Sequence, residues 1–161
     1  MNANRRELLL GSGALSAMPV VGLHAQSRSE VELTRSLIQA QRQELVADAM
    51  DLTADEEKKF WPLYREYRGE MAKIGDRVVQ LIMDYAEAYR DNKVTDANAT
   101  TMLDEHLKLE EAKLGTRKKY LKPFREILPG AKVTRFYQIE NKLDTVVNMD
   151  LVREIPLMEK S

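Results

Sequence analysis

Cysteine is absent from this chain of 161 residues, and histidine and tryptophan are scarce, with two copies and one. Without cysteine the chain can form no disulfide, no thiolate metal site and no thiol nucleophile. Glycine-rich phosphate loops, nucleophile elbows and Ser/His/Asp sets are also missing. A formal net charge of −1 gives no basic field for nucleic acid. These absences predict a protein that is not an enzyme, carries no cofactor and binds no nucleic acid.

Strand patterns are missing as well, because apolar and polar residues nowhere alternate with a period of two. Hydrophobic residues make up 43% of the chain and charged residues 32%, a mixture typical of a folded chain rather than a disordered one. The length fits one domain. Apolar residues recur instead at helical spacing. The sequence therefore predicts an all-α protein.

The N-terminal segment, residues 1–25, has the pattern of a signal peptide. Arg5 and Arg6 give it a charged start, and a mildly apolar stretch follows from Leu8 to Leu23. The small residue Ala25 places cleavage before Gln26. The run around the two arginines resembles a twin-arginine export signal, and an ordinary secretory signal remains the alternative. We expect an exported protein whose mature part, residues 26–161, is a single helical domain.

Four helices are predicted, over residues 30–49, 53–90, 95–128 and 131–151. The second carries the clearest pattern, an apolar ladder whose steps alternate between four and three residues: Phe60, Tyr64, Tyr67, Met71, Ile74, Val78, Leu81, Tyr85 and Ala88. A seven-residue repeat of this length is typical of coiled-coil packing. Pro62 lies within this helix and is expected to kink it or to delay its regular part, and Pro123 is expected to bend the third helix.

Apolar stripes are also predicted on the other three helices. On the first helix the repeat is Val31, Ile38 and Leu45. The main stripe of the third helix is Leu103, Leu107, Leu114, Leu121, Phe124 and Leu128, flanked by Met102, His106, Leu109, Tyr120 and Ile127. On the fourth helix the inward residues are Phe136, Ile139, Leu143, Val146 and Val147.

The unequal lengths of these helices have a consequence for the surface. The second would span about 55 Å at 1.5 Å per residue, and the third is nearly as long, whereas the first and fourth are much shorter. The long hairpin must then project beyond the short helices. Soluble monomers rarely leave large apolar patches bare, so we expect a partner to cover the surplus. A second copy of the chain is one such partner, and a client protein is the other.

The richest aromatic segment, residues 60–67, is a candidate for that contact. Tyr64 and Tyr67 follow the apolar ladder and are expected to pack, whereas Trp61 and Leu63 lie off it and are expected at the surface. Large rigid aromatic side chains with a polar edge suit adaptable binding. They also fill helical cores, and both interpretations remain open. We take Trp61, Leu63, Tyr64 and Tyr67 as candidate residues for binding a client or partner.

A short basic run at residues 117–119 adds Arg117 and Lys118 to these candidates. On a helix such a run usually faces solvent, but it can also attract acidic segments of a partner. His106 lies four residues before Glu110, so the two could share one helix face. Two ligands do not make a metal site, and we expect none.

The start of the second helix has a capping box. The side chain of Thr53 can accept the amide of Glu56, while the Glu56 carboxylate reaches back to the amide of Thr53. With Leu52 before it, this segment resembles the LTxxQ signature of the Spy/CpxP-like periplasmic proteins, with Glu56 in the glutamine position. The segment Leu128–Lys132 resembles a degenerate second copy.

That resemblance covers most of the mature chain in helix order. It implies an elongated, cradle-like, antiparallel homodimer in the periplasm, built on a long central helical hairpin. Members of the family act as ATP-independent chaperones, as accessory regulators of envelope-stress sensor kinases, or in metal response. The chain departs from the chaperone members in being slightly acidic rather than basic. It departs from the metal-responsive members in having almost no histidine.

Two functions are therefore expected. In the first, the chain is a periplasmic, ATP-independent, chaperone-like protein that binds unfolded or partly folded envelope proteins through an apolar and aromatic helical surface. In the second, it is an accessory regulator or structural partner of one envelope protein, such as a stress sensor kinase. One apolar surface would serve either function.

Overall fold

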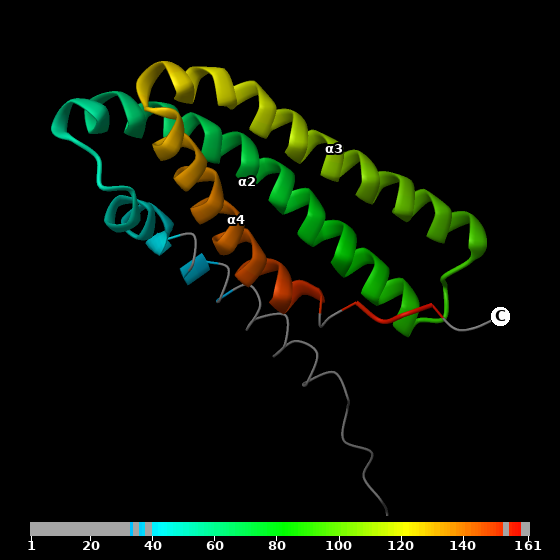
Figure 1. Cartoon of the computed structure of the whole chain (residues 1–161). Coiled ribbons are helices and arrows are strands. Elements are labelled where there is room, and N and C mark those ends of the chain that lie inside the picture. The colour runs from blue at the N-terminus through cyan, green and yellow to red at the C-terminus, as the bar shows by residue number, and fades with distance from the viewer. Residues whose placement is uncertain (1–32, 34–35, 38–39, 153–154, 159–161) are drawn as a thin grey trace, which may run out of the picture.

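The computed structural model describes residues 33, 36–37, 40–152 and 155–158, and this part of the chain is all-helical with no strand. An N-terminal helix, helical at residues 33, 36–37 and 40–50, precedes α2 (Ala54–Arg90), α3 (Asp96–Ile127) and α4 (Gly130–Val152) (Figure 1). The expected all-α fold of four helices is confirmed. The expected signal peptide and its cleavage position, Ala25 and Gln26, lie outside the described residues.

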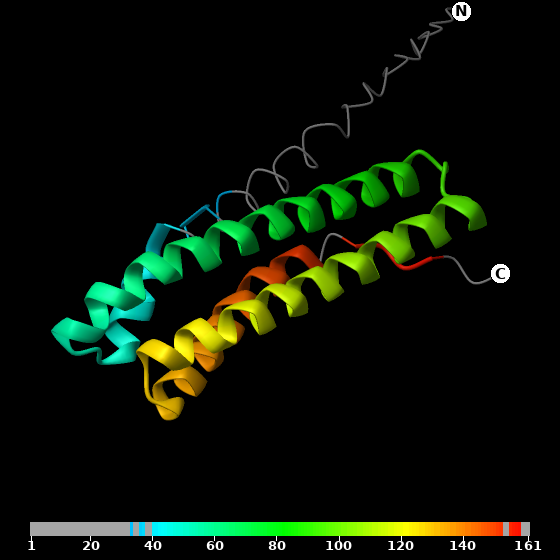
Figure 2. The ribbon, with the colours of Figure 1, turned by 90° about the horizontal axis from the view of Figure 1, so that it is seen from above.

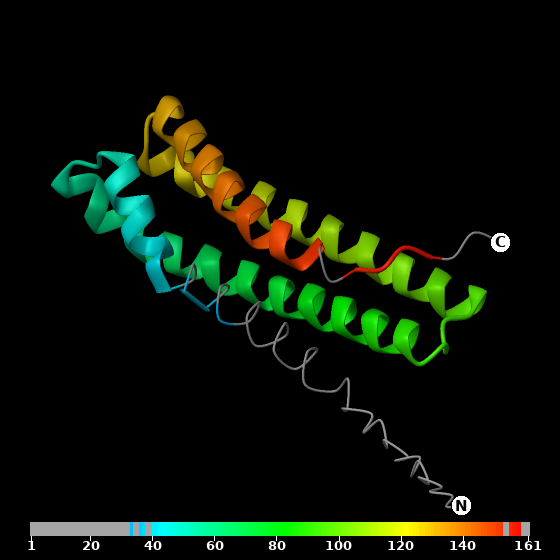
Figure 3. The ribbon, with the colours of Figure 1, turned by 90° about the horizontal axis from the view of Figure 1, so that it is seen from below.

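A long antiparallel hairpin forms the body of the molecule. Its arms are α2, with 37 residues, and α3, with 32, and they run side by side in all three views (Figures 1–3). Asn92 makes the reversal between them with a left-handed φ of 54°, which asparagine tolerates better than most residues. The amide of Lys93 closes the turn on the carbonyl of Ala88 at 2.8 Å.

The N-terminal helix and α4 both lie on one face of this hairpin, at the end where α2 begins and α3 finishes (Figure 3). Because α4 has only 23 residues, the far end of the hairpin extends beyond it (Figure 1). Residues 155–158 continue toward that end, where the hydroxyl of Tyr85 donates to the carbonyl of Pro156 at 3.1 Å. Within the described residues, the four helices therefore share a common core at one end of the hairpin.

Local signals fix where the helices begin. Thr53 caps α2 and Thr95 caps α3, each in a complete capping box with Glu56 and Asn98 respectively. These caps satisfy amides that the first helical turn leaves without partners. The capping box expected at Thr53 and Glu56 is thus present. Pro62 and Pro123 lie inside continuous helices.

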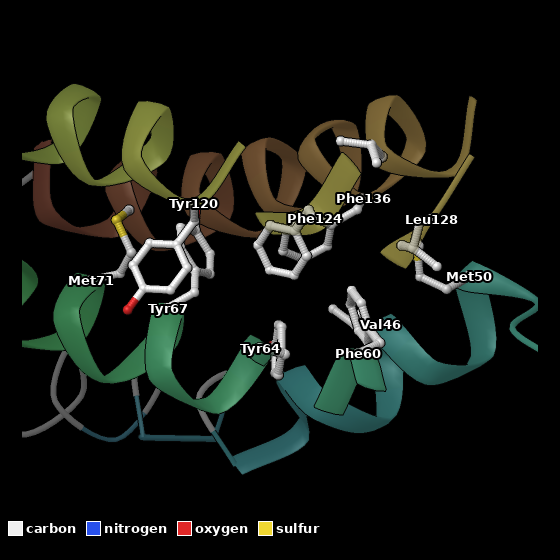
Figure 4. Close-up of a cluster of buried hydrophobic side chains, with 11 residues drawn as sticks. Val46, Met50, Phe60, Tyr64, Tyr67, Met71, Tyr120, Phe124, Leu128 and Phe136 are labelled. Atoms are coloured by element: carbon white, nitrogen blue, oxygen red, sulfur yellow. The ribbon is translucent and has the colours of Figure 1, made fainter. Parts of the chain in front are cut away.

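The core is unusually aromatic (Figure 4). Phe60, Tyr64 and Tyr67 of α2 face Tyr120 and Phe124 of α3 and Phe136 of α4, and all six are buried. The closest pair is Phe124 with Phe136, whose ring centroids are 4.6 Å apart. Val46 and Met50 of the N-terminal helix close the end of the cluster nearest Leu128. Large rings from α2, α3 and α4 therefore interlock at the centre of the core, and the N-terminal helix adds aliphatic side chains to it.

In three helices, the residues that are buried differ from those that the sequence predicts to be buried. In the N-terminal helix the buried row is Arg42, Val46 and Met50, and Leu45 is exposed. In α3 the hairpin side before Tyr120 carries Met102, Leu109 and Thr116, and the main leucine stripe turns away from it. In α4 the expected core residue Val146 is exposed, because the buried row runs instead through Val133, Phe136 and Glu140.

Candidate functional site

A buried network of charges joins all four helices, and we call it the arginine–carboxylate network. Arg42 of the N-terminal helix, Arg68 of α2 and Arg117 of α3 meet two carboxylates of α4, Glu140 and Asp144. Glu140 accepts from the Nη1 atoms of Arg42 and Arg68 at 3.2 and 3.0 Å. Asp144 accepts from the Nη2 atoms of Arg42 and Arg117 at 2.7 and 2.9 Å. Each carboxylate thus bridges two guanidinium groups from different helices.

Burial makes this network electrostatically unusual. Glu140 is 0% exposed and Arg42 only 3%, and removing a charge from water is costly unless it is paired. Burial raises the pKa of Glu140 despite its two guanidinium partners. The negative charge of nearby Asp144 raises this pKa further. The Oε1 atom of Glu140 is buried without a hydrogen-bond partner among the described residues. Burial would also raise the pKa of Asp144, but Arg42, Lys113 and Arg68 together outweigh burial and the pKa lies below its ordinary value.

The network could have been anticipated from one signal in α4. Glu140 and Asp144 continue the helical row of Val133 and Phe136 at steps of four, so two acidic residues occupy positions of an inward-facing row. Acidic residues are almost never fully buried unless they are paired. The sequence does not indicate which of the many arginines would supply the pairing.

An exposed apolar row lies on α3, and we call Leu103, Leu107 and Leu114 the leucine stripe. Their side chains are 56%, 53% and 51% exposed. Further along the same stripe, Leu121 is half-buried against the core and Leu128 is fully buried. The predicted stripe is therefore covered where it reaches the four-helix core and bare before it. Glu110, Lys113 and Arg117 share a shallow groove with Leu107 and Leu114.

The predicted aromatic site residues occupy the core instead of a surface. Tyr64 and Tyr67 are buried among the rings of Phe124 and Phe136, so a partner on the surface of this chain would not reach them. Trp61, expected at the surface, is half-buried, with its ring 5.0 Å from that of Phe60. Leu63, also expected at the surface, is likewise half-buried against the core. All four side chains are therefore used in packing at the end of the hairpin where the four helices share a core.

The basic run of α3 is divided among three environments. Arg117 is half-buried in the arginine–carboxylate network. Lys119 pairs with Glu70 of α2 at 2.5 Å, and the hydroxyl of Tyr120 donates to the same carboxylate at 3.0 Å. Lys118 is exposed on the helix face and, unlike Lys119, has no ion-pair partner among the described residues. Of the two basic residues predicted for partner binding, therefore, only Lys118 presents its side chain freely to solvent.

The two segments that resemble the LTxxQ signature meet in space. Lys132, near the start of α4, donates to the Glu56 carboxylate at 2.6 Å and to the carbonyl of Asp51 at 2.8 Å. Lys132 and the Thr53 amide together hold the pKa of Glu56 below its ordinary value. Leu52 packs against the core and Leu128 lies within it. Glu56 therefore both caps α2 and fastens it to the start of α4.

Comparisons with known proteins add no relative to these observations: no family model, no curated protein and no solved structure matches the chain. Within the described residues, no helix is both long and apolar enough to cross a membrane. Among the same residues, no group of three or more histidine or acidic side chains is placed to hold a metal ion.

Proposed function

We propose that this chain is an exported, ATP-independent, chaperone-like protein that binds apolar segments of unfolded or partly folded envelope proteins. The observation that carries the proposal is the leucine stripe. On the part of α3 before the core, three leucines face away from the hairpin while Lys113 and Thr116 are half-buried on the side toward it. A helix selected only for folding would place its leucines inward. Leucines kept at the surface favour a role in contact with another polypeptide.

The strength of such contacts suits transient holding. Each leucine of the stripe is about half exposed, so covering it would contribute roughly 1 kcal/mol. Three such side chains give a weak, reversible interaction. Glu110, Glu111 and Lys118 are exposed on the same stretch of α3 and offer charges of both signs around the apolar row. Weak contacts without a fixed geometry favour many clients over one.

The cellular setting belongs to the same proposal. Residues 1–25 have the pattern of a signal peptide, which supports export to the periplasm. An ion pair between Lys132 and Glu56 joins the segments Leu52–Glu56 and Leu128–Lys132. Because both segments resemble the signature of the Spy/CpxP-like proteins, their contact supports a relation to that family. An antiparallel homodimer remains part of the proposal on this resemblance.

The test is suppression of aggregation. At near-stoichiometric ratios the purified protein should slow the light-scattering rise of a chemically unfolded test protein. A variant with Leu103, Leu107 and Leu114 all changed to Ser should lose most of this effect, because roughly 3 kcal/mol of contact corresponds to about two decades in affinity. Substitutions at exposed positions should leave the fold intact, which circular dichroism checks.

A matched control removes the same number of exposed leucines elsewhere. Leu33, Leu37 and Leu45 of the N-terminal helix are also exposed, and changing all three to Ser should leave the suppression largely intact. If both triple variants lose suppression equally, the effect comes from exposed apolar surface in general and not from the leucine stripe. No suppression by the unaltered protein, even at a large molar excess, would contradict the proposal.

The alternative function is an accessory regulator or structural partner of one envelope protein. The regular spacing of the leucine stripe, with steps of four and seven residues, favours it, because such a row fits the groove of a single partner helix. Crosslinking in cells through a photoreactive residue at Leu107 separates the two functions. Many adducts support the chaperone-like function, whereas one dominant adduct that is lost when Leu103 and Leu114 are both changed to Ser supports a dedicated partner.

A further inference from the structure

A cavity lies between the helices beside the arginine–carboxylate network, with a volume of about 80 Å³. We call it the interhelical cavity, and residues from all four helices line it. Its polar lining consists of Arg42, Arg68, Glu110, Lys113, Asp144 and Asn148. Its apolar wall is formed chiefly by Met71, Ile74, Val78, Val79 and Val147. One space therefore joins a polar lining to an aliphatic wall.

Two cations of the polar lining have unused hydrogen-bond donors. Arg68 carries five N–H groups and, among the described residues, donates through Nη1 to Glu140 alone. Lys113 is half-buried and makes no hydrogen bond or ion pair with any described residue. The side chain of Arg68 comes from α2 and that of Lys113 from α3, so the cavity collects donors from both arms of the hairpin.

Three of the four carboxylate oxygens of Glu140 and Asp144 already accept from guanidinium groups of the network, and Glu140 Oε1 has no partner among the described residues. Asp144 accepts from Arg42 at Oδ1 and from Arg117 at Oδ2. Glu140 accepts from both Arg42 and Arg68 at Oε2. Counting the network together with the cavity lining, four cations face three anions, an excess of one positive charge. The groups counted are Arg42, Arg68, Lys113 and Arg117 against Glu110, Glu140 and Asp144. One further anion would balance the charge.

We propose that the interhelical cavity binds one aliphatic carboxylate per chain, with its carboxylate on Arg68 and Lys113 and its hydrocarbon chain on the valine and isoleucine wall. Charged donors hold carboxylates more strongly than neutral ones do, and mixed sites of this kind fix orientation with few polar groups. Glu110 and Lys113 also line the groove beside Leu107 and Leu114, so a longer hydrocarbon chain passes these two charged residues before it reaches the leucines. The proposal is independent of chaperone-like function.

The ligand chemistry has two natural sources, a free fatty acid and the C-terminal carboxylate of an apolar polypeptide. Isothermal titration of the full chain with octanoate is the first measurement, and 1-octanol and octylamine are the matched controls. A second arm titrates a short peptide that ends in Val-Leu with a free carboxylate, against the same peptide amidated. We expect one octanoate per chain, with both controls at least tenfold weaker, the loss of one charge-assisted hydrogen bond. Tighter octanoate binding assigns the site to fatty acids, and tighter peptide binding assigns it to polypeptide C-termini.

Two variants test the assigned residues. Lys113→Gln breaks no hydrogen bond or ion pair among the described residues, although it removes a charge that helps to lower the pKa of Asp144. It should weaken carboxylate binding roughly tenfold, as should Arg68→Gln. Lys118→Gln removes the same charge from the exposed face of the same helix and should change nothing. Equal affinity for octanol and octanoate, unchanged binding in Lys113→Gln, or no binding of any carboxylate would overturn the proposal. Aggregation suppression is measured separately, so either proposal can fail alone.

Discussion

Glu140 and Arg42 are the most costly residues to bury in this fold. An ion pair removed from water gains attraction but loses hydration, so its net contribution to stability is small while the loss of one partner is expensive. Here the carboxylate of Glu140 meets two guanidinium groups, and Arg42 meets two carboxylates. The opposed charges raise the pKa of Arg42 although its burial alone would lower it. Because the partners come from different helices, the pairing also fixes the register of those helices.

A substitution at Arg42 tests this account. Arg42→Met keeps the length of the side chain but leaves the buried Glu140 with Arg68 alone. We expect the free energy of unfolding to fall by roughly 3–5 kcal/mol, the cost of breaking a buried pair from one side. Urea unfolding followed by circular dichroism measures the change.

The control is another arginine paired with a glutamate, at the surface. Arg77 of α2 pairs with Glu105 of α3, but its side chain is mostly exposed. Arg77→Met should cost less than about 1 kcal/mol, because exposed pairs contribute little. Equal losses in the two variants would show that burial of the network is not what makes it matter.

Among the elements, α3 carries apolar residues on two of its sides. The same helix buries Leu109, Tyr120 and Phe124 while it exposes the leucine stripe on another side. A helix with two apolar rows can serve two contacts, one with α2 and one beyond the chain. The outer row is therefore the feature of α3 that folding alone does not account for.

The start of α2 offers a prediction for a single element. Thr53→Ala removes the cap that accepts the amide of Glu56, and we expect a loss of about 1 kcal/mol in the free energy of unfolding. Thr134→Ala is the matched control, because the exposed hydroxyl of Thr134 donates only to a carbonyl of its own helix, that of Gly130 at 3.0 Å. Urea unfolding should separate the two variants. A loss at Thr134 as large as that at Thr53 would contradict a capping role.

On the scale of the whole molecule, the four helices share a core at one end and the hairpin extends beyond α4 at the other (Figure 1). The large exposed apolar residues are distributed accordingly. Apart from the leucine stripe they include Val146, Met149 and Val152 of α4 and Leu157 of the C-terminal segment. Apolar surface therefore remains for more than one partner, which is compatible with a homodimer that still binds clients.

The solution mass tests that arrangement. We expect analytical ultracentrifugation to give twice the mass of one chain. The triple Ser variant of the leucine stripe should keep this mass, because clients need the stripe to be free in the dimer. A variant that becomes monomeric would assign the stripe to the dimer interface instead, and a monomeric unaltered protein would contradict the homodimer.

How much could be predicted depends on the range of the interactions involved. The bounds of α2, α3 and α4 follow from capping residues and helical spacing, which act within a few residues along the chain. The structure places each end of these three helices within one residue of the expected position. The long seven-residue repeat of α2 likewise identified Phe60, Tyr64, Tyr67 and Met71 as packed. The resemblance to the Spy/CpxP-like proteins stays a prediction.

The sequence by itself determined that this chain is helical, where its helices start and which row of α2 faces inward, because hydrogen bonds and caps within a helix are local. Only the tertiary structure decided which row of α3 stays bare, where the aromatic rings gather and which arginines meet Glu140 and Asp144. Those pairs join residues separated by as many as 102 positions. Their geometry depends on how four helices pack together, and no single helix carries that information.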